Sequence, residues 1–534
     1  MKKSVFTLLF LALIVVAFTS CEGEDGMDGR DGVDGVDGAD GADGADGEDG
    51  EDVTQTALIP LESSVVPDEV FELKGGFATS ANLKMIMSSA DILRSDSTFV
   101  YGSFMDGAAL FSNNDGTYSF INNLESDYSI ARIKMNSNLE PLEGDYIVNA
   151  TATAFTAQCS GSSITVEEHG FGPLYLSGGE WGGNAKGVYR VNPFRSPDDR
   201  VEAQRLPALG EWSTENAVVI GKDAYPGQTV VFMGDDDSNN TYPEAHFAMY
   251  VGGLGDLNGG DLYVLRGKDT TETAIGGGGL KFEMGMVEDN TYDVEWVKVE
   301  ERTLAELNQE AIDSVAIGFQ RIEDIDWQRG SAENNRNVYF NATGRRRSDN
   351  PDLANRGTTF GRVYKLELNP DDPTGDAKIT VVIDGDREGG IGDGMHSPDN
   401  ILVTENYVYV QEDPNGYAEF NTDIQGYAKL WQYDISAGTL SEVMECNQVA
   451  ATELGYGTTD RYWEITGLID VTDIIGASEP TFVGGAQVHG WNFSTTPETA
   501  VRADGAKFVD PTAIDEGLAR LEGSFLFKIT GLPR

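Results

Sequence analysis

Acidic residues follow the ends of strand-like segments at several distant points in this chain. The clearest case is residues 229–233, an apolar run rich in valine, which ends in Gly234 and then in Asp235, Asp236 and Asp237. Carboxylate oxygens are the ligands that hard cations such as Ca²⁺ prefer. A lone acidic turn is usually a solvated loop, but here a buried-looking strand delivers the carboxylates. The pattern therefore predicts a metal site on a rigid β-scaffold.

Similar acidic turns recur along the chain, each at or near the end of a predicted strand. Taken singly, each is more typical of a solvated turn than of a ligand. Taken together they favour one shared site, because loops at one mouth of a closed β-fold converge. The turns are 122–125, 178–180, 213–215, 233–236, 321–324, 397–400 and 411–413.

The elements that must position these turns are short strands with polar or glycine-rich connections. The two windows that start at Gly361 and Ala428 have the same pattern, which predicts a repeated β-hairpin. Repeated hairpins predict an all-β fold, a β-propeller with insertions, and a stacked β-sandwich is the alternative. Residues 304–315 have helical character and are interpreted as an insertion between blades. The predicted strands are 117–122, 228–233, 261–266, 337–341, 361–368, 378–383, 400–411 and 429–435.

The N-terminal part predicts a lipid-anchored, exported protein. Residues 1–21 read as a lipoprotein signal peptide with Cys21 as the lipidation site, and an ordinary signal peptide is the alternative. In residues 22–52 glycine recurs every third position and aspartate or glutamate fills most of the rest. The pattern is formally collagen-like, but it lacks proline and repels itself, so we predict a disordered tether. A trimeric stalk is the alternative. Residues 53–534 form the predicted propeller, with 53–93 as a possible separate cap.

The charge of the chain limits its partners. It carries 89 acidic and 37 basic residues, a net charge of −52, which argues against binding nucleic acid. Acidic residues directly after Cys21 resemble the surface-export signal of Bacteroidetes-type lipoproteins. We therefore expect an outer-membrane lipoprotein on the cell surface, with the periplasmic face as the alternative and the lipid anchor as its membrane contact. Whether Cys159 and Cys446 pair is open, and so is the oligomeric state.

The order of the motifs resembles the PhoX-type alkaline phosphatases. The V-V-F-M-G-D-D of 230–236 and the P-D-N-I of 398–401 are the more specific matches. Shorter ones are N-L-E at 123–125, C-S-G at 159–161, R-I-E-D at 321–324 and Q-E-D at 411–413. The resemblance implies a secreted β-propeller that needs Ca²⁺ and iron and hydrolyses small phosphomonoesters.

One departure from the family concerns the metal. The family's W-L-T-C-E-E, whose cysteine binds iron, corresponds to Y-L-S-G-G-E at 175–180, so that the thiolate position is Gly178. Cys159 aligns elsewhere and is not taken as its substitute. Thiolate selects iron whereas carboxylates suit Ca²⁺. We therefore expect Ca²⁺, and the missing cysteine argues against iron.

The resemblance also assigns the site residues. Arg321 and Asn123 would hold the phosphate, although Arg321 could instead form a salt bridge to Glu323 or Asp324. We interpret His246, His396 and His489 as structural, with His396 as an alternative ligand or acid. The implied metal ligands are Glu180, Glu215, Asp235, Asp236, Glu323, Asp324, Asp399, Glu412 and Asp413.

Two alternatives to a phosphomonoesterase stay open. One is a non-catalytic, calcium-stabilised propeller that serves as a binding or adhesion module, which the missing cysteine favours. The other is a phosphodiester, phytate or lactone hydrolase on a calcium propeller. The sequence contains no G-x-S-x-G elbow, Walker loop or C-x-x-C pair, so nucleophile-elbow, nucleotide and dithiol chemistries are not expected.

Overall fold

The folded part of the chain is a set of antiparallel sheets that follow one another in sequence order. The computed structural model describes residues 57–534, except 203, 240–241, 274, 346–354 and 415–425. The predicted signal peptide with Cys21 and the predicted tether lie outside the described residues. The predicted all-β fold is confirmed.

The sheets form six blades, and the first strand of each blade lies innermost. The third and fourth blades share one nine-stranded sheet, and each other blade is a sheet of its own. The first blade is β3 (Met105–Ser112), β4 (Tyr118–Leu124), β5 (Ser129–Met135) and β6 (Pro141–Val148); the second is β7 (Thr156–Ile164), β8 (Leu174–Gly182), β9 (Gly187–Val191) and β10 (Gln204–Arg205). The third is β11 (Thr214–Val219), β12 (Gln228–Asp235), β13 (Phe247–Gly253), β14 (Asp261–Gly267) and β15 (Thr291–Val299); the fourth is β16 (Ile322–Trp327), β17 (Asn337–Ala342), β18 (Arg362–Glu367) and β19 (Ala377–Asp384). The fifth is β20 (Pro398–Val403), β21 (Tyr407–Glu412), β22 (Lys429–Asp434), β23 (Thr439–Cys446) and β1 (Phe71–Leu73); the sixth is β24 (Glu464–Asp470), β25 (Thr481–Asn492), β26 (Glu522–Thr530) and β2 (Asn82–Ser88).

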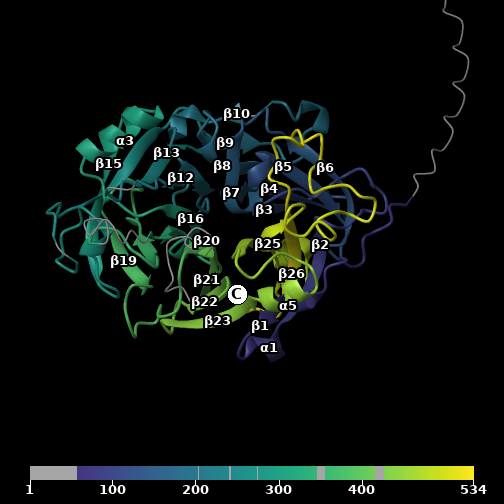
Figure 1. Cartoon of the computed structure of the whole chain (residues 1–534). Helices are drawn as coiled ribbons and strands as arrows, with labels where there is room; N and C mark the ends of the chain where they lie inside the picture. The colour runs from purple at the N-terminus through teal and green to yellow at the C-terminus, as the bar shows by residue number, and fades with distance from the viewer. Residues whose placement is uncertain (1–56, 203, 240–241, 274, 346–354, 415–425) are drawn as a thin grey trace, which may run out of the picture. The chain divides into compact units, whose positions relative to one another are not determined.

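The innermost strands close into a ring, which makes the fold a propeller rather than a sandwich. In order around the ring, β3 contacts β7, β7 contacts β11, β11 contacts β16, β16 contacts β20, β20 contacts β24, and β24 contacts β3 (Figure 1). The N-terminal strand β2 pairs with the C-terminal strand β26 and so completes the sixth blade. The ring therefore closes through strands from both ends of the domain, which leaves few free sheet edges.

Helices are short and lie between the strands. The predicted helix at 304–315 is confirmed as α3 (Leu304–Asp313), inserted between the third and fourth blades, where β15 pairs with both β14 and β19. The others are α1 (Phe77–Ser80), α2 (Val166–His169), α5 (Gln448–Glu453), α6 (Thr472–Ile475) and the 3₁₀ turns η1 (Asp68–Val70), η2 (Glu125–Asp127), η3 (Pro197–Asp199), η4 (Pro207–Leu209), η5 (Glu283–Gly285) and η6 (Asn334–Arg336). None of the helices in the described residues is long and apolar enough to cross a membrane.

Most predicted strands are confirmed, with two corrections. The predicted strand 400–411 is a hairpin of β20 and β21, because the backbone turns at Thr404, whose N–H donates to Tyr407 O at 2.9 Å. Of the predicted cap 53–93, the described residues 57–93 are not separate, because β1 pairs with β23 and β2 pairs with β26. The two similar windows are the outer hairpins β18–β19 and β22–β23 of neighbouring blades, as a repeat requires.

The core fills the space between the blades with apolar and aromatic side chains. Between the third and fourth blades, the Phe247 and Phe340 rings lie 4.3 Å apart, and the Phe340 and Tyr364 rings stack at 4.8 Å. Cys159 and Cys446 are both buried and free, so the pairing that the sequence left open does not occur. This packing holds the innermost strands rigidly, which is what a metal site needs.

Candidate metal centre

A β-bulge recurs in the innermost strand of every blade. The bulge of the sixth blade, Gly467–Leu468, carries no ligand group, whereas those of the first five blades do. At each bulge, two residues of the first strand lie opposite one residue of the second strand. A bulge breaks the strict alternation of a strand and re-aims its side chains. The bulge pairs, from the first blade to the fifth, are Asp106–Gly107, Cys159–Ser160, Glu215–Asn216, Glu323–Asp324 and Asp399–Asn400.

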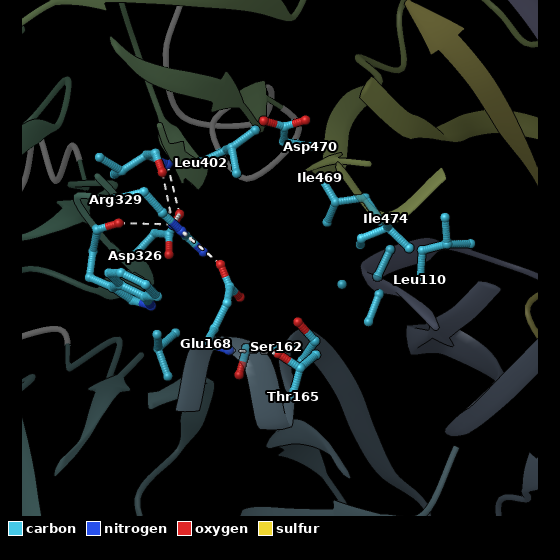
Figure 2. Close-up of a pocket in the computed structure, with 18 of the residues that line it drawn as sticks. Leu110, Ser162, Thr165, Glu168, Asp326, Arg329, Leu402, Ile469, Asp470 and Ile474 are labelled. Carbon is cyan, nitrogen blue, oxygen red and sulfur yellow. Dashed lines mark hydrogen bonds and ion pairs between the residues drawn. The ribbon is translucent and has the colours of Figure 1, made fainter. Parts of the chain in front are cut away.

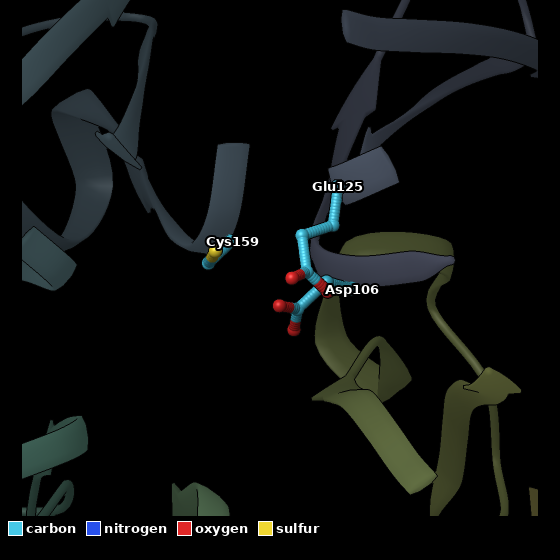
Figure 3. Close-up of side chains that lie close together, drawn as sticks. All are labelled: Asp106, Glu125 and Cys159. Atoms are coloured by element: carbon cyan, nitrogen blue, oxygen red, sulfur yellow. The ribbon is translucent and has the colours of Figure 1, made fainter. Parts of the chain in front are cut away.

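The first residue of each of these five bulges bears a carboxylate or a thiol, and these groups meet at one end of the ring. They are joined by side chains near the ends of second strands, because an antiparallel second strand ends where the first begins. Three groups result, and within each the possible ligand atoms lie within 4.8 Å of one another. The groups are Asp106 with Glu125 and Cys159 (Figure 3), Cys159 with Glu180 and Glu215, and Glu215 with Glu323 and Asp399.

Cys159 and Glu215 each belong to two of these groups, so the three form one continuous cluster, which we call the central cluster. The Cys159 thiol donates to Glu180 Oε2 at 3.0 Å, and the backbone N–H of Ser160 donates to Glu215 Oε1 at 3.0 Å. A fourth group, Asp413 with Glu464 and His489, comes from the fifth and sixth blades. Cys159, which the sequence analysis did not take as a substitute for the missing thiolate, therefore lies within the site.

The second-strand residue that lies opposite each of these five bulges contacts the backbone at the bulge of the next blade. Asn341 Nδ2 donates to Asp399 O at 2.8 Å, across from the fourth blade to the fifth. Glycine fills this position where the backbones approach more closely: a Cβ on Gly178 would lie 1.9 Å from Glu215 O, and one on Gly234 would lie 2.5 Å from Glu323 O. A cysteine at position 178 would therefore collide with the strand that carries Glu215.

Asn123, one of the two predicted phosphate-binding residues, occupies this position opposite the bulge in the first blade. Its Nδ2 donates to Cys159 O at 2.6 Å, to Ser160 O at 3.2 Å and to Ser177 Oγ at 3.0 Å. The side chain is fully buried. The amide N–H groups are thus already used to hold β7, which carries Cys159.

Arg321, the other predicted phosphate-binding residue, borders the central cluster. Its Nε donates to Asp236 Oδ1 at 2.8 Å, and its Nη2 lies 3.0 Å from Asp236 Oδ2 and 2.9 Å from Glu323 Oε1. The predicted alternative of a salt bridge to Glu323 is therefore present. The backbone of Arg321 is left-handed, with φ of 63°, a strained conformation that is common at functional sites.

The predicted metal ligands divide into two sets. Glu180, Glu215, Glu323, Asp399 and Asp413 lie in the four groups, and Asp236 joins them through Arg321. In the remaining three residues, both carboxylate oxygens accept hydrogen bonds from N–H groups of the surrounding chain. These are Asp235 on Ser213 N and His246 N, Asp324 on Ile325 N and Ile401 N, and Glu412 on His396 N, Lys429 N and Trp431 Nε1.

Five members of the four groups were not assigned as ligands from the sequence, although Glu125 lies in the predicted acidic turn 122–125: Asp106, Glu125, Cys159, Glu464 and His489. A signal was present for Asp106, because it stands second in its strand, as Glu215, Glu323 and Asp399 do. Glu464 begins its strand, while Cys159 stands fourth in a longer one, so its position depends on the register of the bulge.

Burial and mutual repulsion govern the electrostatics of the central cluster. Burial, aided by the neighbouring Glu125 carboxylate, raises the pKa of Asp106 to about 7. Burial also raises the pKa of Glu215, and the nearby Asp106 and Glu180 add to the rise. The pKa of the Cys159 thiol is raised by burial and by Glu215. These raised pKa values mean that the groups hold protons in the metal-free protein. The mutual repulsion of the groups strongly favours positive charge at the same positions.

Comparison with known proteins places this architecture in a family. The family model described as "Alkaline phosphatase PhoX" matches residues 187–474, more than half of the chain. The chain belongs to the PhoX family. The match spans the third and fourth blades entirely and the fifth blade except β1, and hence Glu215, Glu323 and Asp399.

One solved structure supports the fold of this PhoX-family chain. PhoX from Pseudomonas fluorescens, solved in complex with vanadate, a transition-state analogue, matches with a TM-score of 0.57 at 14% identity, over 89% of this chain and 97% of that chain. The catalytic domain of an α-L-arabinofuranosidase from Coprinopsis cinerea matches with a TM-score of only 0.29 at 11% identity, over 64% of this chain and 91% of that chain. No curated protein matches the chain.

The donor set of this PhoX-family chain fits metal ions. Its central cluster gathers carboxylates and a thiol that are buried and mutually repulsive, and Arg321 offsets only part of that charge. Buried charges of one sign are unfavourable unless they are paired or coordinate a metal. The carboxylates could therefore hold metal ions, and removal of their protons would accompany binding.

A cavity of about 920 Å³ lies among the blades (Figure 2). In the first five blades its lining includes the second bulge residues, Gly107, Ser160, Asn216, Asp324 and Asn400, but none of the first ones. Arg329, Asp326 and Glu168 lie farther along it. The bulges therefore form a wall between this cavity and the central cluster.

Glu412→Gln separates bracing residues from ligands. We expect metal content to be unchanged, because the oxygens of Glu412 are engaged by three N–H donors. We expect the free energy of unfolding to fall by about 1–3 kcal/mol, since an amide NH₂ would face one of these donors. Elemental analysis and thermal unfolding measure the two effects. Loss of bound metal in a folded variant would return Glu412 to the ligand set.

Proposed function

We propose that this PhoX-family protein is a metal-dependent phosphomonoesterase whose centre is the central cluster. The observation that carries the proposal is the convergence of buried carboxylates and one thiol, from successive blades, at the end of a propeller of this family. Arg321 at the edge of the cluster adds a donor suited to phosphate. A small phosphorylated molecule is the substrate that this chemistry fits.

The groups differ in the metal that they would hold. Glu215, Glu323 and Asp399 offer oxygen ligands alone, which suit Ca²⁺. The two groups that share Cys159 add a soft sulfur ligand, which favours a transition metal such as iron. The bound cations would supply the positive charge that a phosphoryl group needs as its negative charge develops.

The protein's own residues would bind and orient the substrate. Arg321 keeps about a fifth of its side-chain surface exposed, so its guanidinium can reach a phosphoryl oxygen from the edge of the cluster. Asp236 and Glu323 hold the guanidinium plane on two sides, which fixes the direction of its donors. A fixed donor loses little conformational freedom when it binds, and this favours the charged transition state over the substrate.

The test is hydrolysis of p-nitrophenyl phosphate by the full chain after chelation, and after Ca²⁺, iron or both are restored. Turnover that returns with the metals supports the proposal. Metal binding without turnover would favour the non-catalytic binding module instead. Greater activity on a phosphodiester, phytate or a lactone in a parallel panel would favour the other hydrolase reading.

Metal removal is expected to make stability fall as pH rises. The folded, metal-free protein keeps protons on carboxyls such as Asp106, whose pKa is raised to about 7, whereas the unfolded chain loses them near pH 4. Between these values the folded state holds more protons, so raising the pH favours unfolding. Thermal unfolding with and without Ca²⁺, at about pH 5 and about pH 8, measures this. Equal stabilisation by Ca²⁺ at both values would contradict it.

We also propose that residues 1–21 direct lipidation of Cys21 and that residues 22–52 tether the propeller, from residue 53 onward, to the outer face of an outer membrane. The support is the basic start, the apolar run and the acidic glycine repeat of the sequence. Incorporation of a radiolabelled fatty acid, lost in Cys21→Ala, tests the anchor. Protease accessibility on intact cells distinguishes the cell surface from the periplasmic face.

A further inference from the structure

His489, which sequence analysis interpreted as structural, is held in one orientation by a fixed carboxylate. His489 Nδ1 lies 3.3 Å from Glu522 Oε2. Glu522 is itself anchored, because its Oε1 accepts from Gly490 N at 3.0 Å and from Asn492 Nδ2 at 3.0 Å. A carboxylate on one imidazole nitrogen keeps the proton there and leaves the other nitrogen as an electron-pair donor.

That other nitrogen is buried and has no partner. His489 is 6% exposed, and its Nε2 makes no hydrogen bond to the described residues. A buried polar atom without a partner is costly, and most such atoms in proteins are satisfied. The arrangement therefore calls for a group that accepts an electron pair at this point.

Two carboxylates lie close to the His489 ring. An oxygen of Asp413, directly after β21, and one of Glu464, at the start of β24, lie within 4.8 Å of one imidazole nitrogen and of each other. Glu464 is buried, and Asp413 is half-buried. The neighbouring Asp399 carboxylate adds a further negative charge. Burial raises the pKa of Glu464, and Asp399 adds to the rise. A cation would give the orphan nitrogen a partner and offset the charge of both carboxylates.

We propose that Asp413, Glu464 and His489 form a separate metal position that takes a divalent transition metal ion of the zinc class, with Glu522 as the positioning residue. Imidazole suits zinc and similar ions, whereas Ca²⁺ takes oxygen ligands. The three groups of the central cluster contain only carboxylates and a thiol. The position deepens the proposed function because it borders that cluster, and its occupancy can be measured without turnover.

The location gives this position a structural consequence as well. Asp413 belongs to the fifth blade, and Glu464 and His489 belong to the sixth, which closes the ring through β2 and β26. An ion held between them links the closing blade to its neighbour. Its loss should therefore lower the unfolding temperature as well as the zinc content.

The experiment titrates the chelator-treated full chain with Zn²⁺, in the presence of Ca²⁺, and counts bound zinc. His489→Gln should lose one zinc ion per chain, and Glu522→Gln should weaken that ion's affinity by about 10–100-fold. His396→Gln is the matched control, because His396 is also buried, its ring nitrogens make no hydrogen bond to the described residues, with Nε2 3.9 Å from Glu412 Oε2, and it belongs to none of the four groups. It should keep every zinc ion.

A spectroscopic measurement complements the count. Cu²⁺ in place of Zn²⁺ should show imidazole nitrogen coupling in pulsed electron paramagnetic resonance, and His489→Gln should abolish it while His396→Gln does not. If His489→Gln fails to fold, Asp413→Asn and Glu522→Gln carry the same test. Unchanged zinc count and affinity in the folded variants would overturn the proposal. Bound zinc in a protein without phosphatase activity would sustain it and count against the proposed function.

Discussion

Glu215→Gln is expected to lower kcat for p-nitrophenyl phosphate by about 10³-fold or more. Glu215 is shared by two groups of the central cluster, so the loss of its charge weakens two metal positions at once. The Gln amide keeps the size of the side chain and can still accept from Ser160 N, which donates to Glu215 Oε1 at 3.0 Å. The fold should survive, and steady-state kinetics with elemental analysis should show activity and bound metal falling together.

The neighbouring residue supplies the control. Asn216 is the second residue of the same bulge, and it lines the cavity on the other side of the wall, with Nδ2 donating to Ile325 O at 3.3 Å. Asn216→Ser should leave metal content and kcat within about threefold of the wild type, since it perturbs the same backbone without touching the cluster. Equal losses in both variants would mean that the bulge, and not the Glu215 carboxylate, is what the activity depends on.

The ligands that the sequence could predict share a position in their blades. Glu215, Glu323 and Asp399 each stand second in an innermost strand, and apolar residues farther along mark the strand. Alternation of strand side chains then implies that they share a face with their counterparts in other blades. The fold class was predictable for the same reason, because the hairpins of the fourth and fifth blades repeat visibly.

Adjacent carboxylates show where sequence reasoning fails. In Asp235–Asp236 and Glu412–Asp413 the second residue faces the site, whereas in Glu323–Asp324 the first one does. The first two pairs end a second strand, and the third begins a first strand at a bulge. A one-residue change of register turns a side chain to the opposite face, and a bulge makes such a change locally. The two cases look alike in sequence.

Cys159 shows the same limit more sharply. By motif order the thiolate belongs at position 178, but there the chain passes so close to Glu215 O that only glycine fits. The bulge of β7 instead brings Cys159 to the place that Asp106, Glu215 and Glu323 occupy in their own blades. Equivalent positions in a repeat fold can thus exchange ligand types, and only the strand register shows that they are equivalent.

Cys159→Ser is accordingly expected to remove the transition metal while leaving the calcium-type positions occupied. Burial and Glu215 raise the pKa of the Cys159 thiol. In the metal-free protein the thiol therefore keeps its proton and donates a hydrogen bond to Glu180. A bound transition metal would deprotonate it and produce a thiolate-to-metal absorption band. The variant should lack that band, bind less iron in elemental analysis and lose about 10²-fold or more in kcat.

Cys446→Ser is the matched control, because Cys446 is the other buried, free cysteine and lies in β23 of the fifth blade. It should keep the absorption band, the metal content and the activity. If Cys159→Ser also keeps the band and the iron, sulfur is not a ligand and the cluster binds its metals through carboxylates alone. We expect Cys159→Ser to lose the band and the iron, because Cys159 joins the Asp106–Glu125 pair to the Glu180–Glu215 pair. Its loss should therefore divide the central cluster.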